Sequence, residues 1–137
     1  MAGYSGTPLW KKLGIKAQSE IYRANGPDDY LDLISPLPAG VRFVPRLTRE
    51  TDLVHIFVTE KVRLARQLAS ALSRMKPDGV IWVSWPKRSS KVPTDITEDT
   101  IREVALPLDL VDIKVCAVDE IWSGLKLMIR KEKRKQL

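Results

Sequence analysis

The chain has little of what metal and disulfide sites require. Its 137 residues include one cysteine, Cys116, and one histidine, His55. A single cysteine excludes an internal disulfide bond, and a zinc site would have to recruit carboxylates to reach four ligands. We therefore expect no metal. No stretch approaches the roughly eighteen apolar residues that span a bilayer, and the first residues lack the apolar core of a secretory signal. These absences predict a cytoplasmic protein.

What is present is the composition of a globular domain. Hydrophobic residues make up 44% and charged residues 29% of the chain, which excludes a disordered chain. The length suits one domain, which we place at residues 1–129, followed by a basic tail at 130–137. Five bases and one acid between Arg130 and Lys135 supply +4 of the net charge of +6. We expect this tail to be solvated rather than to bind nucleic acid.

The first third of the chain predicts short elements. Thr7 has the character of a helix N-cap, Pro8 suits the first helical position, and Gly14 suits the position after the helix end. The other elements expected here are a strand at 20–25, a helix that starts from the turn at 25–28 and runs to Ile34, and a strand at 41–44 that Pro45 stops and places at a sheet edge.

The middle of the chain predicts a strand, helix, strand unit. The continuous apolar run at 53–58 is typical of a strand covered on both faces of a parallel sheet. Apolar residues then recur every three or four positions up to Met75, as in a helix with one buried face. The turn at 76–79 ends this helix, and a second buried strand follows at 80–85. Such a unit has a right-handed crossover.

The last third predicts a helix and a hairpin. Asp95 and Glu98 have the spacing of a capping box, and Pro107 limits the helix to about Leu106. Alternating patterns at 110–118 and 122–130 indicate an antiparallel hairpin. The fold class expected is therefore α/β: a single Rossmann-like, methyltransferase-like sheet, mostly parallel with a C-terminal antiparallel hairpin, and helices on both faces.

The order of elements over 52–130, including the turn at 76–79, resembles the C-terminal half of class I S-adenosylmethionine-dependent methyltransferases. In those enzymes a glycine-rich loop after the first strand and an acidic residue ending the second strand hold the cofactor. Here the loop after the first strand, 25–29, has one glycine, and Arg46 lies near the position where those enzymes have the acidic residue. We therefore expect no cofactor.

A second resemblance covers nearly the full length of the chain. It lies in the segments 2–9, 82–87, 92–98 and 115–125, which are similar to those of the bacterial family called domain of unknown function 3052. This family carries no assigned activity. The resemblance thus implies a bacterial cytoplasmic protein with this fold and transfers no catalytic residue.

Ligands of open α/β sheets bind beyond the carboxyl ends of the parallel strands. This rule nominates the segments 25–29, 59–61 and 85–91, and the last of them combines cations, hydroxyls and an aromatic ring that suit a phosphate or another anion. An ordinary solvated connection is the alternative for that loop. The candidate ligand-binding residues are Asn25, Asp28, Thr59, Trp85, Lys87, Arg88, Ser89 and Lys91.

Other chemically capable residues have structural interpretations. We expect His55 to be a neutral core residue with one backbone partner, and Cys116 to be a small buried hydrophobe. Asp28 and Asp29 at a helix entry more often complement the helix dipole than act as acid and base. The arm at 3–6, flanked by glycines, could be a recognition or modification site or simply an arm packed on the fold.

The function expected is that of a non-catalytic Rossmann-like binding domain for an anionic small molecule or a protein partner. Catalytic residues stay unknown. One alternative is a divergent S-adenosylmethionine-dependent methyltransferase. Another is weak, non-specific nucleic-acid binding, which would need the basic tail to share one face with Lys87, Arg88 and Lys91.

Overall fold

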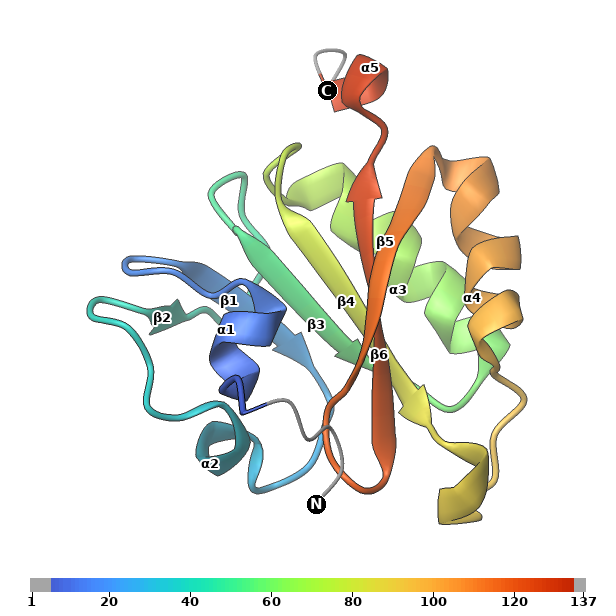
Figure 1. Cartoon of the computed structure of the whole chain (residues 1–137). Coiled ribbons are helices and arrows are strands. Elements are labelled where there is room, and N and C mark those ends of the chain that lie inside the picture. Colours follow the sequence, from blue (N-terminus) through green and yellow to red (C-terminus); the bar gives the residue numbers. More distant parts are fainter. Residues whose placement is uncertain (1–5, 135–137) are drawn as a thin grey trace.

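The computed structural model describes residues 6–134, so most of the arm at 3–6 and the last three residues of the tail lie outside the described part. Its core is a six-stranded sheet with helices on both faces (Figure 1). The elements are α1 (Leu9–Leu13), β1 (Glu20–Ala24), α2 (Tyr30–Ile34), β2 (Arg42–Phe43), β3 (Leu53–Phe57), α3 (Lys61–Arg74), β4 (Val80–Pro86), η1 (Arg88–Ser90), α4 (Glu98–Ala105), η2 (Leu106–Leu108), β5 (Leu110–Ala117), β6 (Trp122–Ile129) and α5 (Lys131–Arg134).

The strand order is β2-β1-β3-β4-β6-β5. The first four strands in this order pair in parallel, β6 runs antiparallel to β4, and β5 runs antiparallel to β6. The predicted fold class is thereby confirmed. β3 lies inside the sheet, and all of its residues are buried, as its continuous apolar run indicated. The edge position of the strand before Pro45 is also confirmed, although β2 is only two residues long.

The two faces of the sheet carry separate cores. On one face, Leu64 and Leu68 of α3 and Ile101 of α4 pack against residues such as Ile56 and Val83. On the other face, the residues packed together are Leu13, Ile15, Ile21, Tyr30, Ile34, Leu53, Phe57, Trp82 and Val118. Figure 1 shows α3 behind the sheet with α4 at the right beside β5, and α1 in front of β1 with α2 below it at the lower left. No described helix lies in front of the β6–β5 hairpin.

Two helix starts differ from their predictions. Pro8, not Thr7, occupies the N-cap position of α1. α2 begins at Tyr30 rather than directly after Pro27, because the Tyr30 N–H bonds the Pro27 carbonyl at 3.1 Å and closes a turn first. Asp29 takes the N-cap position of α2 but makes no side-chain cap bond.

The capping box of α4 was assigned to the wrong pair of residues. Thr97 and Thr100 form it, with bonds of 3.1 and 3.3 Å between each backbone N–H and the other hydroxyl. Asp95 instead accepts a bond of 2.8 Å from the Lys61 N–H and so caps α3. A contact distant in sequence decides this choice, because threonine and aspartate both have the oxygen that a helix N-terminus needs.

The end of α4 lies at Ala105, one residue before the expected end, and Pro107 continues within η2. None of the helices within residues 6–134 combines the length and the apolarity needed to cross a bilayer.

Candidate functional site

The carboxyl ends of β1 and β3 enclose a crevice of about 280 Å³. β1 continues toward β2 on one side of the sheet and β3 toward β4 on the other, so the crevice lies at the topological switch point. The residues that line it are Asn25, Gly26, Pro27, Phe57, Val58, Thr59, Arg63 and Trp122. The structure therefore brings two predicted candidates, Asn25 and Thr59, into one site.

Aromatic rings form the wall of this crevice. Phe57, the last residue of β3, meets the Trp122 ring edge-on with 5.1 Å between ring centroids. Gly26 has a φ of +112°, and a Cβ atom there would lie 2.8 Å from the Phe57 ring. A larger residue at position 26 would clash with the Phe57 ring, so the glycine of this loop makes room for that ring. Trp122, the first residue of β6, forms the other part of this wall.

Three polar side chains line the crevice. Asn25 follows β1, Thr59 follows β3, and Arg63 lies in the first turn of α3. The Thr59 carbonyl is held from the α4 side, because it accepts bonds from the Asp95 N–H at 3.2 Å and from the Thr94 hydroxyl at 2.7 Å. Among the described residues, neither the Asn25 amide nor the Thr59 hydroxyl has a side-chain partner. Both groups are thus available to a ligand.

Arg63 is the one charged side chain among the described lining residues. Its only ion pair there is with Glu60, at 3.8 Å, and both side chains are mostly exposed. Such a pair contributes little to stability and leaves the guanidinium free to bind an anion. The sequence reasoning missed Arg63. The sequence does place Arg63 shortly after a strand end, where ligands bind, but Lys61 and Arg66 lie at similar positions and nothing distinguishes the three.

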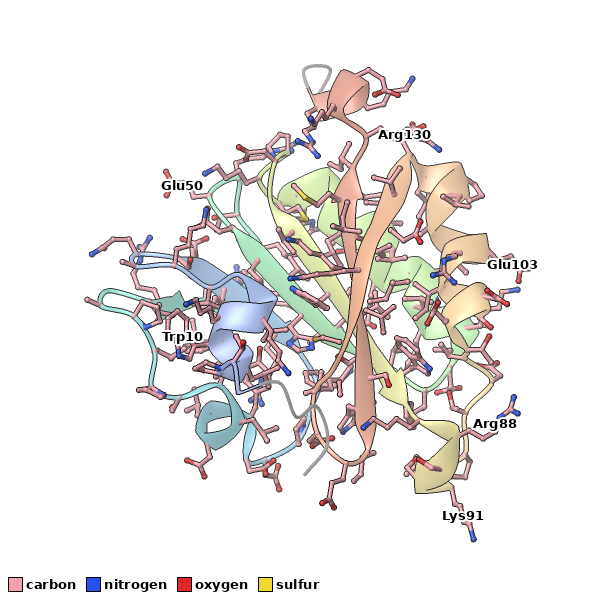
Figure 2. The ribbon with its side chains drawn as sticks, in the orientation of Figure 1. Trp10, Glu50, Arg88, Lys91, Glu103 and Arg130 are labelled. Atoms are coloured by element: carbon pink, nitrogen blue, oxygen red, sulfur yellow. The ribbon has the colours of Figure 1, made fainter. Side chains whose placement is uncertain are left out.

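The loop after β4 does not join the crevice. Trp85 is 8% exposed and packs in the core under α3 and α4. Lys87 is fastened to the hairpin turn, because its Nζ donates to the Asp119 carbonyl at 2.6 Å and its N–H to the Ile121 carbonyl at 2.7 Å. Figure 2 shows Arg88 and Lys91 extending away from the molecule. Two further candidates, Ser89 in η1 and Asp28, are also exposed and do not line the crevice.

A second pocket, of about 410 Å³, lies on the other side of the loop that follows β1. Its lining residues are Arg23, Tyr30, Leu31, Phe43, Val44 and Pro45. The Arg23 guanidinium lies 4.9 Å from the Tyr30 ring centroid and donates to the Pro27 carbonyl at 3.1 Å. Arg23 therefore supports the loop between the two pockets.

His55 is a core residue, as predicted, but its partners are side chains rather than backbone. Its Nδ1 is 2.9 Å from the Tyr30 hydroxyl and its Nε2 is 2.7 Å from the Ser84 hydroxyl. All three residues are buried, and the Phe57 ring stacks on the imidazole with 4.2 Å between centroids. Burial lowers the pKa of His55 to about 3, so the imidazole is neutral. Burial also raises the pKa of the Tyr30 hydroxyl.

Cys116 is half-buried rather than fully buried, and desolvation raises the pKa of its thiol. Lys12 and the neighbouring Lys114 lower the pKa of this thiol, but the effect of burial is larger.

The described part of the tail, residues 130–134, does not share a face with the loop after β4. Arg130, at the start of the tail, lies at the opposite end of the sheet from Arg88 and Lys91 (Figure 2). The reason is that Arg130 follows β6 and Arg88 follows β4, and these two strands are antiparallel neighbours.

No family model matches the chain, and neither does any curated protein. The resemblance to the domain of unknown function 3052 thus stays a prediction. Solved structures do match. A SAM-dependent methyltransferase from Aquifex aeolicus has a TM-score of 0.59 at 14% identity, with 88% of this chain and 87% of that chain covered. A putative type 11 methyltransferase from Sulfolobus solfataricus has a TM-score of 0.54 at 11% identity, with 82% and 85% covered.

The fibrillarin pre-rRNA processing protein of Methanococcus jannaschii also matches, with a TM-score of 0.57 at 10% identity and coverage of 90% of this chain and 69% of that chain. Identities this low define a fold and not an activity. The chain therefore has the Rossmann-like fold found in S-adenosylmethionine-dependent methyltransferases.

Within residues 6–134, the two described pockets lack the features that hold this cofactor in other proteins of the fold. The space beside Gly26, which a cofactor's backbone cradle would need, is filled by the Phe57 ring. The end of β2 contributes Val44 and Pro45 to the neighbouring pocket, and the one charged group lining that pocket within the described residues is the cation of Arg23. A carboxylate for the ribose hydroxyls is absent from both described linings.

Proposed function

We propose that this chain is a non-catalytic binding domain for a small anionic molecule, held in the crevice between the ends of β1 and β3. The observation that carries the proposal is the lining of this crevice. Asn25, Thr59 and Arg63 offer an amide, a hydroxyl and a guanidinium to one space of about 280 Å³, and its described lining includes no acidic residue.

The charge of the ligand follows from Arg63. A guanidinium binds carboxylate or phosphate through two parallel hydrogen bonds, which a loosely paired surface arginine can provide. The N-terminus of α3 offers the anion few additional hydrogen-bond donors, because the Asp95 carboxylate already accepts the Lys61 N–H bond. Arg63 is therefore the expected anchor, with Asn25 and Thr59 as further hydrogen-bonding groups.

The shape of the ligand follows from the wall and the volume. Phe57 and Trp122 offer ring faces and edges to an apolar group. A space of about 280 Å³ lies just below the usual range for small-molecule sites, which begins at about 300 Å³. The ligand class that fits is a compact ring or short chain with one carboxylate or phosphate group, and not a dinucleotide.

The position of His55 supports the proposal of a non-catalytic role. Its imidazole is fully buried, keeps a pKa of about 3, and is bonded on both nitrogens, so it is not poised to move a proton in the crevice. Ser84, which is also fully buried, does not line the crevice either.

A thermal-shift series tests the proposal. The probes are inorganic phosphate, benzoate, a mononucleotide and S-adenosylmethionine, and a ligand present at a hundred times its dissociation constant adds about 2.7 kcal/mol of stability. We expect a shift with at least one small anion, and we expect Arg63→Gln to remove it. Arg66→Gln, which changes an exposed arginine on the same helix outside the crevice, is the matched control.

Two results would contradict the proposal. A shift with S-adenosylmethionine alone would favour the methyltransferase alternative that the fold resemblance supports. If Arg88→Ala removed the thermal shift caused by the anion and Arg63→Gln did not, the anion would bind at the loop after β4 instead of in the crevice.

A further inference from the structure

A cluster of lysines lies on the part of the α1 side of the sheet, over β5 and β6, that no described helix covers. Lys114 of β5 is directly opposite Lys126 of β6 in the antiparallel ladder. Lys126 is in turn opposite Trp82 of β4, whose indole N–H donates to the Leu13 carbonyl of α1 at 2.9 Å. Directly paired residues point to the same face, so both lysines lie on the α1 side of the sheet.

The charges of this cluster repel one another. Desolvation lowers the pKa of Lys126, and the nearby Lys114 and Lys16 lower it further. None of the ion pairs formed within residues 6–134 involves Lys16, Lys114 or Lys126. Like charges placed directly opposite in a ladder destabilise a sheet. An anionic partner would relieve this repulsion.

The same hairpin presents an open strand edge. β5 ends the sheet, and among the described residues its backbone pairs with no strand other than β6. Ile113 and Val115 on this strand are 48% and 46% exposed. A register shift between Asp112 and Lys114 interrupts the ladder, so the regular part of the edge is Lys114–Ala117. Exposed edges of this kind can accept a further strand.

We propose that the β5 edge, with the Lys114 and Lys126 face beside it, binds an extended segment of another protein in which acidic and apolar residues alternate. The segment would pair with Lys114–Ala117 as an additional strand. Alternate residues of a strand point to opposite faces. Acidic residues would therefore lie on the lysine face, and apolar residues would lie on the opposite face beside Val115.

Other occupants satisfy only part of this surface. A nucleic acid would neutralise the lysines but would leave Val115 and the backbone edge uncovered. A second copy of β5 would pair with the edge but would bring another Lys114 to a cluster that already repels. The proposal is independent of the crevice between β1 and β3.

The test measures binding of a short synthetic peptide in which glutamate and valine alternate. Control probes are the same peptide with lysine in place of glutamate and a thymidine oligonucleotide. Of the three probes, we expect only the glutamate peptide to bind and to slow the hydrogen exchange of the backbone amides of β5. The double variant Lys114→Gln/Lys126→Gln should bind it roughly tenfold more weakly, since exposed charge pairs each contribute up to about 1 kcal/mol.

Matched variants separate binding from folding. Arg66→Gln/Arg74→Gln removes the same charge from exposed positions of α3 and should leave peptide affinity unchanged. Val115→Asp should weaken the binding, whereas Val62→Asp, at an exposed valine of α3, should not. Because the lysines repel, the free double variant should melt no lower than the unchanged protein.

Three outcomes would overturn the proposal. The first is equal binding of the glutamate and lysine peptides. The second is binding of the oligonucleotide that depends on the lysines but not on Val115, which would identify a nucleic-acid surface. The third is a dimer in solution that Val115→Asp converts to monomer, which would assign the edge to a second copy.

Discussion

The buried group Tyr30, His55 and Ser84 and the crevice group Asn25, Thr59 and Arg63 differ in how their polar atoms are satisfied. In the buried group both imidazole nitrogens meet a hydroxyl, at 2.9 and 2.7 Å. In the crevice group the amide and the hydroxyl meet no partner among the described residues. Phe57 separates the two, stacked on His55 and lining the crevice. The comparison teaches that polar groups bonded to one another stabilise the fold, whereas the unpaired groups of the crevice are available to a ligand.

The strongest test of this comparison is Phe57→Ala, which removes the ring between the two groups. We expect a loss of about 3–5 kcal/mol in the free energy of unfolding, because a buried aromatic side chain is replaced by a cavity. Urea unfolding measures the loss. Phe43→Ala is the control, since Phe43 is 41% exposed and its removal should cost far less. Equal losses in the two variants would show that Phe57 is not packed as described.

The neutral state of His55 gives the comparison a pH dependence. Its pKa is about 3 in the folded chain, below its usual value of about 6.5, so the unfolded chain binds a proton that the folded chain does not. Stability should fall as the pH drops from about 6.5 toward 3, by up to about 1.4 kcal/mol per pH unit from this residue.

To isolate the contribution of His55, the free energy of unfolding is measured at several pH values for the unchanged protein and for His55→Gln, and the two curves are compared. The variant should lose less stability on acidification. Parallel curves for the two proteins would contradict a buried, neutral imidazole.

The smallest expected changes in stability are those on removal of the Ser84 and Thr59 hydroxyls. Ser84→Ala should cost about 1–3 kcal/mol, because it leaves a buried nitrogen of His55 without its partner. Thr59→Val, which removes the crevice hydroxyl at nearly constant size, should change stability by less than about 0.5 kcal/mol and should weaken anion binding instead. Thermal unfolding with and without phosphate measures both effects. A costly Thr59→Val would mean that this hydroxyl serves the fold.

The predictable part of the candidate site came from one rule about strand ends. Asn25 and Thr59 follow neighbouring parallel strands, and that rule placed them together correctly. The same rule failed for the residues after β4. Backbone and side-chain bonds from Lys87 to the hairpin turn fasten that loop elsewhere. Arg63 and Trp122 could not be singled out from the sequence, because Lys61 and Arg66 lie at similar positions and nothing local to Trp122 indicates that its ring lines a crevice.

By itself, the sequence determined the strand, helix, strand unit, the hairpin and the edge position of β2. Apolar periodicity and proline act locally, through backbone geometry and burial of one face. Only the tertiary structure decided which residues meet. Asp95 caps α3 rather than the helix that follows it in the sequence. His55 of β3 is hydrogen-bonded to Tyr30 of α2 and Ser84 of β4. The Phe57 ring occupies the space where a side chain at position 26 would lie. These choices depend on strand order and packing, which bring together residues that no local pattern relates.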